Sequence, residues 1–430
     1  MTFISSLPWQ AMLVTDLTGD QRPDVVVTDN GGVFFSILFN NGTGQLKDVR
    51  SLNLPGVTAA GVLFGSPASV AQADFNGDGL GDLAVLTSKS GQYAVKVFAG
   101  TGKSNAPFRV GPSTALATPG TFEPFSMVAG DFNGDGKVDL AIGYSNLLFT
   151  SSVVHVYLGN GDGTFTAGSK FSVSITGLQM IAADFNGDGK LDLASSSGFL
   201  ALGNGDGTFQ NPTVFYTISP LDETLGTWLG AADFNHDGKL DLAFQTPEDV
   251  SNGQPLLIFL GNGDGTFRNP VSYTWGFLPA WGAIADLNRD GNPDVVILSA
   301  EHPHDQIAVF LGNADGSFQM PSFVQLPFAV YPTSIVATDL NGDGKVDLAV
   351  MDDGGNALYL FAGNGDGTFG SGVEFGAAST LLWLGFGNYQ GQTLPGFPVL
   401  VTFDGALNTF FTPSSTAGVA VSTLLNTGQK

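Results

Sequence analysis

Residues 131–139 of the chain read Asp-Phe-Asn-Gly-Asp-Gly-Lys-Val-Asp, and this nine-residue pattern decides the fold. The form Asp-x-Asn-Gly-Asp-Gly-x-x-Asp recurs, with small departures, at 16–24, 74–82, 131–139, 184–192, 233–241, 286–294 and 339–347. We call these segments acidic loops 1 to 7 and number their positions 1 to 9. Three carboxylates and an amide oxygen this close repel one another unless a cation lies among them. The pattern therefore predicts a repeat architecture and hard-metal binding together.

The spacing of the seven copies predicts the architecture. Their first Asp residues stand at 16, 74, 131, 184, 233, 286 and 339, so consecutive copies begin 49 to 58 residues apart. This length fits a unit of four strands, as in a β-propeller blade. In each unit an apolar strand, such as 180–183, enters the acidic loop and a second, such as 191–194, leaves it. A third, such as 153–158, alternates apolar and polar residues.

A second repeated segment, which we call the hairpin loop, follows the third strand. It reads Gly-Asn-Gly-Asp-Gly-Thr-Phe at 159–165, 203–209, 261–267 and 363–369, with a near copy at 312–318. Asn-Gly and Asp-Gly supply the positive φ angles that a tight β-hairpin needs. Pro212, Pro270 and Pro321 each follow three residues after the Phe of their copy. Proline donates no ladder hydrogen bond, so the fourth strand is expected at the outer edge of its blade.

The C-terminal residues predict an eighth unit without an acidic loop. Residues 381–384 and 398–401 resemble its first two strands, and 424–429 resemble a third strand with the start of a hairpin loop. The missing Thr-Phe stands at Thr2-Phe3, so the N-terminal segment is expected to supply the last outer strand and close the ring. The predicted fold is all-β, one domain over residues 1–430: a β-propeller of eight four-stranded antiparallel blades, with seven blades as the alternative. Its units begin near residues 9, 67, 124, 177, 226, 279, 332 and 380.

The acidic loop has the residue order of the first two-thirds of an EF-hand calcium loop. Side-chain oxygens at positions 1, 3, 5 and 9 and the main-chain carbonyl at position 7 would ligate the cation, and Gly at position 6 makes the sharp turn. Oxygen ligands rich in carboxylates select Ca²⁺ over zinc or copper. We expect up to seven Ca²⁺ ions, and acidic turns without metal are the alternative. The predicted ligands are Asp16, Thr18, Asp20, Arg22 and Asp24; Asp74, Asn76, Asp78, Leu80 and Asp82; Asp131, Asn133, Asp135, Lys137 and Asp139; Asp184, Asn186, Asp188, Lys190 and Asp192; Asp233, Asn235, Asp237, Lys239 and Asp241; Asp286, Asn288, Asp290, Asn292 and Asp294; and Asp339, Asn341, Asp343, Lys345 and Asp347.

The seven copies are not equivalent. Loop 1 has Thr18 at position 3 and Gln21 at position 6. Gln must there adopt a turn that Gly adopts freely, at a cost of about 1 kcal/mol, so we expect the weakest cation site in loop 1. His236 and Arg289 replace Gly at position 4, which provides no ligand.

The composition agrees with a globular metal-binding protein. The chain has 39 Asp and Glu residues against 15 Lys and Arg, for a formal net charge of −24, and 43% of its residues are hydrophobic. Much of the acidity lies in the acidic loops, where cations would neutralise it. The scarcity of basic residues argues against nucleic acid and anionic membranes as partners.

Calcium use also predicts where the protein works. Sites of this kind suit the millimolar calcium outside the cell, which indicates a secreted or cell-surface protein. Cysteine is absent, so disulfides and thiol chemistry play no part. No apolar run reaches the roughly 18 residues of a membrane helix, so no membrane insertion is expected. Met1-Thr2-Phe3 does not begin a signal peptide, which indicates that a signal was removed or that the chain is a segment of a longer one.

The acidic loops and the Leu-Ala-Val type of strand after them resemble the FG-GAP repeats of integrin α-subunit propellers and the bacterial VCBS repeats. The resemblance covers seven units and nearly the whole chain. It implies that the acidic loop joins the first two strands of a blade and binds calcium. Members of this family serve in adhesion, in glycan binding and as domains of larger secreted proteins, which implies a glycan or an extracellular protein as partner.

The two faces of the predicted ring differ. Connections 1–2 and 3–4 of a four-stranded blade share one face, and here they are the repeated acidic and hairpin loops. The connections on the other face vary, and variable loops on a regular scaffold are where specific function is expected. Aromatic residues near this variable face are candidates for ligand contact, with packing in the channel or between blades as the alternative. They are Trp9, Trp228, Trp275, Trp281, Tyr331 and Trp383.

Three functions remain open at this point. The first is a calcium-loaded binding or adhesion module for glycan or protein, as a monomer or as a domain of a larger protein. The second is a carbohydrate-active enzyme, a polysaccharide lyase or a glycosidase, since lyases also use calcium-bearing propellers. The third is a scaffold domain of a longer protein. The sequence contains no nucleophile elbow, phosphate loop or His-Glu-x-x-His helix, which favours binding over catalysis.

Overall fold

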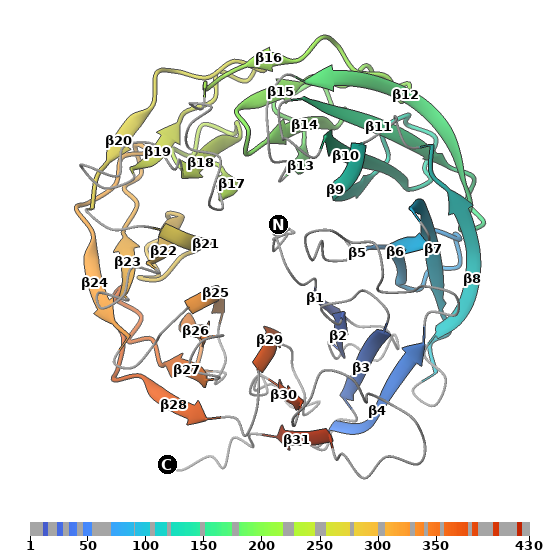
Figure 1. Cartoon of the computed structure of the whole chain (residues 1–430). Helices are drawn as coiled ribbons and strands as arrows, with labels where there is room; N and C mark the ends of the chain where they lie inside the picture. Colours follow the sequence, from blue (N-terminus) through green and yellow to red (C-terminus); the bar gives the residue numbers. More distant parts are fainter. Residues whose placement is uncertain are drawn as a thin grey trace.

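The regular elements of the described residues are all β-strands, and in this computed structural model they form eight antiparallel sheets. Seven sheets have four strands in the order of the chain, and the last has three. Figure 1 shows the sheets set radially around a common centre with the first strand of each sheet innermost, which is the arrangement of a β-propeller. The described residues are 12–15, 24–28, 34–40, 46–53, 70–89, 91–103, 108–117, 122–146, 151–173, 180–217, 228–245, 255–275, 279–299, 306–326, 332–338, 343–352, 357–376, 381–385, 399–403 and 419–423.

The sheets are the blades that the repeat predicts, and we number them in chain order. Blade 1 has β1 (Met12–Thr15), β2 (Asp24–Thr28), β3 (Phe34–Asn40) and β4 (Leu46–Asn53), and blade 2 has β5 (Val70–Ala73), β6 (Asp82–Lys89), β7 (Gln92–Gly100) and β8 (Phe108–Ala115). Blade 3 has β9 (Phe122–Gly130), β10 (Asp139–Asn146), β11 (Ser152–Gly159) and β12 (Phe165–Val173), and blade 4 has β13 (Met180–Ala183), β14 (Asp192–Ser195), β15 (Phe199–Ala201) and β16 (Thr213–Val214). Blade 5 has β17 (Leu229–Ala232), β18 (Asp241–Gln245), β19 (Leu256–Phe259) and β20 (Val271–Tyr273), and blade 6 has β21 (Pro279–Ala285), β22 (Asp294–Ser299), β23 (Gln306–Phe310) and β24 (Ser322–Gln325). Blade 7 has β25 (Pro332–Thr338), β26 (Asp347–Asp352), β27 (Ala357–Phe361) and β28 (Val373–Gly376), and the last sheet has β29 (Leu381–Gly385), β30 (Val399–Phe403) and β31 (Val419–Thr423).

The acidic loops lie where the repeat predicts them. In blades 1 to 7 the second strand begins at position 9 of the acidic loop, so each loop joins the first two strands of its blade. The prediction about edge strands is also confirmed. Pro212, Pro270 and Pro321 directly precede β16, β20 and β24, each of which is the last strand of its sheet.

The C-terminal sheet adds one strand that the sequence did not predict. β29 and β30 coincide with the expected first two strands, and the third described strand is β31, which ends directly before the predicted residues 424–429. Val419, Val421 and Thr423 alternate along β31 and pair with β30, as β-branched residues favour a pleated strand. Residues 1–11 and 424–430 lie outside the described residues, so ring closure by the N-terminal segment stays a prediction, as do the number of blades and the single-domain organisation.

The hydrophobic core lies between neighbouring blades. Strands in the middle of a sheet, such as β10 and β22, are buried along nearly their whole length, whereas the outer strand β24 is mostly exposed. One cluster joins Val128 and Val154 of blade 3 to Met180 and Leu193 of blade 4. Each blade therefore buries its apolar surface only when the next blade is in place. No helix long and apolar enough to span a membrane occurs in the described part of the chain.

An aromatic pair repeats at the junctions between blades. Position 2 of the acidic loop holds a buried Phe in loops 2 to 5, and its ring packs edge-on against the Phe that ends the next blade's hairpin loop. The centroid distances are 5.7 Å for Phe75–Phe165, 5.6 Å for Phe132–Phe209, 6.2 Å for Phe185–Phe267 and 5.4 Å for Phe234–Phe318. Each acidic loop is thus anchored to the following blade as well as to its own.

This anchor predicts a graded response to mutation of Phe132. Phe132→Ala is expected to lower the free energy of unfolding by about 3 to 5 kcal/mol, because it empties a buried site between two blades. Phe132→Leu is expected to cost less than about 1.5 kcal/mol, because Leu287 occupies the same position in loop 6. Denaturant unfolding of both variants measures this, and a loss of equal size for both would contradict the packing role.

Candidate metal centre

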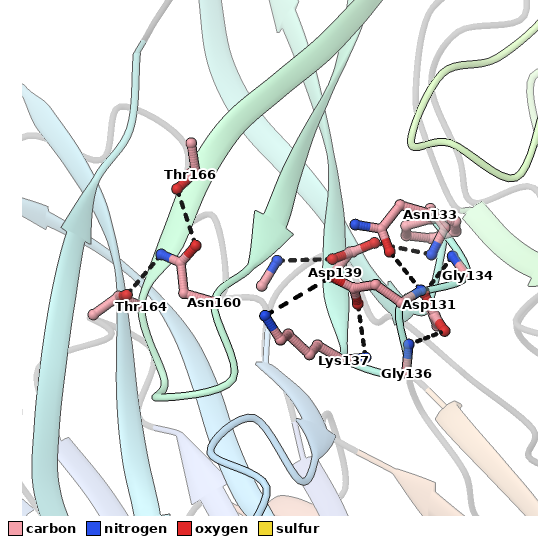
Figure 2. Close-up of polar contacts among 12 residues, drawn as sticks. Asp131, Asn133, Gly134, Gly136, Lys137, Asp139, Asn160, Thr164 and Thr166 are labelled. Atoms are coloured by element: carbon pink, nitrogen blue, oxygen red, sulfur yellow. Dashed lines mark hydrogen bonds and ion pairs between the residues drawn. The ribbon is translucent and has the colours of Figure 1, made fainter.

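Acidic loop 3 shows how the side-chain oxygens are held (Figure 2). Oδ1 of Asp131 accepts hydrogen bonds from the amides of Gly134 (2.7 Å) and Asp135 (3.2 Å), and its Oδ2 accepts one from the amide of Gly136 (2.8 Å). Oδ1 of Asn133 accepts a bond of 2.9 Å from the amide of Asp135. These short-range turns bring the oxygens at positions 1 and 3 into one loop. The same bonds to the position 5 and 6 amides recur in loops 2, 4, 5 and 6.

The loop requires left-handed backbone at two positions. Gly134 and Gly136, at positions 4 and 6, have φ angles of 72° and 79°. Only glycine adopts this region without steric cost. His236 and Arg289 hold position 4 of loops 5 and 6 at φ 57° and 64°, and among the described residues they are the only non-glycines with positive φ.

The closing Asp of the loop ties the acidic loop to the hairpin loop. The Asp139 side chain is fully buried, with its Oδ2 accepting from the Phe132 amide (2.9 Å) and its Oδ1 from the Gly159 amide (2.7 Å). A Cβ on Gly159 would lie 2.2 Å from the Val138 carbonyl oxygen, so only glycine fits there. The carboxylate–glycine bond recurs in the described blades as Asp82–Gly100, Asp192–Gly203, Asp241–Gly261, Asp294–Gly312 and Asp347–Gly363.

The closing Asp has a raised pKa because it is buried and lies near other carboxylates. Burial raises the pKa of the Asp294 carboxyl to about 6, hydrogen bonds from the Gly312 and Leu287 amides oppose this shift, and the charges of Asp290 and Asp286 add to it. Burial raises the pKa of the closing Asp in loops 2 to 5 as well. A cation in the loop would offset this repulsion and favour the ionised carboxylates.

A lysine at position 7 accompanies the position 5 carboxylate in four loops. The Nζ to Oδ2 distances are 3.9 Å for Lys137–Asp135, 3.4 Å for Lys190–Asp188, 3.8 Å for Lys239–Asp237 and 3.4 Å for Lys345–Asp343. These side chains are well exposed, so the pairs contribute little to stability. A divalent cation at the position 5 carboxylate would compete with this ammonium group.

The donor set fits a hard cation. Within the described residues, no three acidic or histidine side chains come together as a metal-binding group. The fully described loops, 2 to 6, instead offer a mixed set: carboxylates at positions 1 and 5, an amide oxygen at position 3 and a main-chain carbonyl at position 7. Oxygen donors of these kinds in a Gly-punctuated loop are those that Ca²⁺ takes. The closing carboxylate already binds two amides but keeps further lone pairs, so its role as a ligand stays a prediction.

Comparison with known families agrees with the repeat. The model of the FG-GAP-like repeat matches residues 16–85, 74–142, 143–195, 250–297, 286–350 and 339–391, which together make up more than half of the chain. The chain belongs to the FG-GAP-like repeat family. No curated protein is recognisably similar to it in sequence.

One solved structure shares the fold of this FG-GAP-like protein at low sequence identity, and two others align with lower scores. The rhamnogalacturonan lyase PL11 of Bacillus licheniformis aligns with a TM-score of 0.54 and 14% identity over 92% of this chain and 69% of the lyase. The V. cholerae biofilm matrix protein Bap1 gives 0.42 and 12% over 93% and 85% of the two chains. The fucose-specific lectin of Aleuria aurantia gives 0.37 and 14% over 85% and 95%. The similarity to the lyase is one of fold alone.

Two of the six candidate aromatic residues are packed inside the protein. Trp228 and Trp275 expose only 5% and 6% of their surface and belong to one core cluster. The Trp228 ring of blade 5 lies against Gly282 of β21 in blade 6, where a Cβ would come within 2.8 Å of it. Trp275 packs edge-on against Phe310, with 6.4 Å between ring centroids. For these two residues the structure supports the packing alternative.

The other candidate residues are described less fully or not at all. Trp281 and Trp383 lie in β21 and β29, but their side chains are outside the described part of the chain, as are Trp9 and Tyr331 altogether. In loop 1, residues 16–23 are not described, and in loop 7 residues 339–342 are not. The weaker site predicted for loop 1 therefore stays a prediction.

Two roles in this FG-GAP-like repeat were not predicted from the sequence. The closing Asp was predicted as a cation ligand alone, although its carboxylate also joins two loops through backbone amides. The Phe at position 2 was given no role, although its ring anchors the next blade. Both had a signal in the sequence. A Gly begins each hairpin loop, and a Phe follows the first Asp in loops 2 to 5 and ends each hairpin loop.

The two kinds of carboxylate are expected to respond differently to mutation. Asp139→Ala leaves two buried amides without an acceptor, which should cost about 2 to 5 kcal/mol of unfolding free energy, with or without calcium. Asp135→Ala removes an exposed hydrogen bond within the turn and an exposed ion pair, both with Lys137. In chelator this substitution should therefore lower the free energy of unfolding by no more than about 1 kcal/mol. It should still reduce the stabilisation gained on adding calcium.

Denaturant unfolding of both variants, in chelator and in calcium, measures these effects. Equal losses for the two variants in chelator would show that the closing Asp has no separate scaffold role.

Proposed function

We propose that this FG-GAP-like propeller is a calcium-stabilised module that binds a glycan or a protein outside the cell. The observation that carries the proposal is the acidic loop itself. It recurs on one face with one pattern of hydrogen bonds, and its side-chain oxygens point into the loop. Such repetition is a property of a scaffold, which leaves recognition to the face where the connections differ.

Calcium would act on stability in this proposal. A cation that binds only the folded chain at ten times its Kd adds about 1.4 kcal/mol per site. Several such sites together are comparable to the 5 to 15 kcal/mol of a typical domain. Loops of this class, which lack the rigid helices of an EF-hand, suit millimolar calcium, and this supports a secreted or surface location.

The variable face is the proposed surface for the partner. Its connections differ from blade to blade in the described residues. In blade 4, β14 and β15 are joined by a tight turn whose Ser195, Ser196 and Ser197 are buried, whereas in blade 3 a longer connection joins β10 to β11. Because Trp228 and Trp275 are packed inside, partner contacts must come from other residues of these connections. A neutral or weakly charged glycan, or a protein surface, suits a chain of net charge −24.

Calcium removal tests the structural half of the proposal. Chelation of the purified protein is expected to lower the melting temperature by about 10 °C or more relative to millimolar calcium. Magnesium at the same ionic strength should restore much less, because Mg²⁺ demands octahedral geometry and gives up its waters reluctantly. An unchanged melting temperature after chelation would refute calcium as a structural ligand.

A glycan array with a parallel product assay tests the binding half. The lyase resembles this chain in fold alone, so polysaccharide cleavage is a competing outcome. We expect saturable binding to a subset of glycans in calcium, loss of that binding in chelator, and no new reducing ends or unsaturated products. Product formation on the bound polysaccharide would replace the binding module with an enzyme.

A further inference from the structure

At three junctions, neighbouring blades are joined on the repeated face by the same backbone hydrogen bond. An amide of one blade's hairpin loop donates to the position 2 carbonyl of the preceding blade's acidic loop. The pairs are Gly163 to Phe75 (3.0 Å), Gly207 to Phe132 (2.9 Å) and Gly367 to Leu287 (3.3 Å). In this way an acidic loop contacts two hairpin loops, its own through the closing Asp and the next through this carbonyl.

The junction between blades 5 and 6 departs from this pattern. The hairpin loop of blade 6 has Ala314 where the other copies have a glycine with φ between 76° and 78°. The turn is rebuilt, and the Gly316 amide donates 2.9 Å to the Asn313 carbonyl inside its own hairpin. The amide that crosses to the preceding acidic loop at the three junctions named above is therefore engaged within blade 6.

A side-chain bond crosses the same junction instead. His236 Nε2 lies 2.8 Å from Asn292 Oδ1, with the imidazole as donor and the amide oxygen as acceptor. His236 stands at position 4 of loop 5, where the other described loops apart from loop 6 have glycine, and it holds a φ of 57° there. Asn292 stands at position 7 of loop 6, whose main-chain carbonyl is a predicted cation ligand. The bond thus joins two acidic loops directly.

The residue at position 4 of loop 6 reaches in the same direction. Arg289 Nη2 lies 3.5 Å from the place of a Cβ on Gly344, which is position 6 of loop 7. The two described side chains that occupy a glycine position in the acidic loops are therefore both directed to the next acidic loop. This shared direction indicates that the departures from glycine serve a contact between blades.

We propose that the His236–Asn292 bond couples the cation sites of loops 5 and 6, so that binding in one raises the affinity of the other. The inference rests on the calcium binding proposed above. A cation in loop 5 would fix the backbone that carries His236, and His236 would then hold Asn292 with its carbonyl in place for the second cation. Because part of the ordering of loop 6 is completed by the first ion, the second ion loses less conformational entropy. The coupling must act equally in both directions.

Hydrogen exchange of the whole protein, followed by mass spectrometry, reads each loop separately. The calcium midpoint for protection of a peptide covering 233–241 reports loop 5, and one covering 286–294 reports loop 6. Asp286→Ala removes a predicted ligand of loop 6 whose hydrogen bonds go to the Asp290 and Gly291 amides and not to Asn292. It is expected to move the loop 5 midpoint about fivefold to higher calcium, the lower end of typical couplings. Asp237→Ala should move the loop 6 midpoint by the same factor.

His236→Gly is the decisive background, because it restores the glycine of the repeat, folds without strain and keeps every predicted ligand. In that background Asp286→Ala should move the loop 5 midpoint less than about twofold, since the coupling is lost. Asn292→Leu, which places at position 7 the residue that Leu80 provides in loop 2, is the matched variant from the other side and should give the same result.

The outcomes separate the two proposals. A fivefold shift that persists in His236→Gly would overturn the coupling through His236 while leaving calcium binding intact. A loop 5 peptide with no calcium-dependent protection in the wild-type protein would refute calcium binding in that loop, and the coupling with it.

Discussion

The buried carboxylate that closes each acidic loop is the constraint on which the repeated face depends. In Asp139 and its equivalents, one oxygen holds the start of the acidic loop and the other holds the glycine that opens the hairpin loop. A buried charge is costly unless hydrogen bonds satisfy it, and here backbone amides do so. The raised pKa of these groups shows that the amides do not fully offset burial and repulsion. A cation would supply the missing stabilisation without changing the loop's connections.

The stability of the ring follows from how blades share their contacts. Apolar clusters span neighbouring blades, and the Phe at position 2 of one acidic loop packs on the next hairpin loop. A single blade therefore has neither a complete core nor a complete loop environment, as in other repeat proteins. A cation bound in one blade would consequently stabilise contacts that belong to two. An irregularity in one hairpin loop, such as Ala314, therefore lies at a contact with the acidic loop of the blade before it.

The period of the acidic loop was enough to predict the strands, their order and the edge prolines, because a four-stranded unit leaves few arrangements for such a repeat. The C-terminal unit lacks the loop, and β31 (Val419–Thr423) was not predicted there, because only β-branched alternation marks it. Burial of Trp228 and Trp275 was not predictable, because a position near a strand end does not reveal which neighbouring blade covers the ring. The amide contacts of the closing Asp were missed because cation binding alone accounts for its residue type.

The departures from the repeat are more informative about function than the repeat is. Glycine adopts the left-handed backbone of position 4 without strain, whereas His236 and Arg289 adopt it at a conformational cost. A contact that glycine cannot make would offset this cost. Both side chains reach the following blade, and the His does so at the junction where Gly316 keeps its amide within its own turn. Substitutions at separate places in the chain thus meet at one interface in space. By the same reasoning, the unrepeated connections on the opposite face are the proposed place for a partner, since the repeated loops already supply what the scaffold needs.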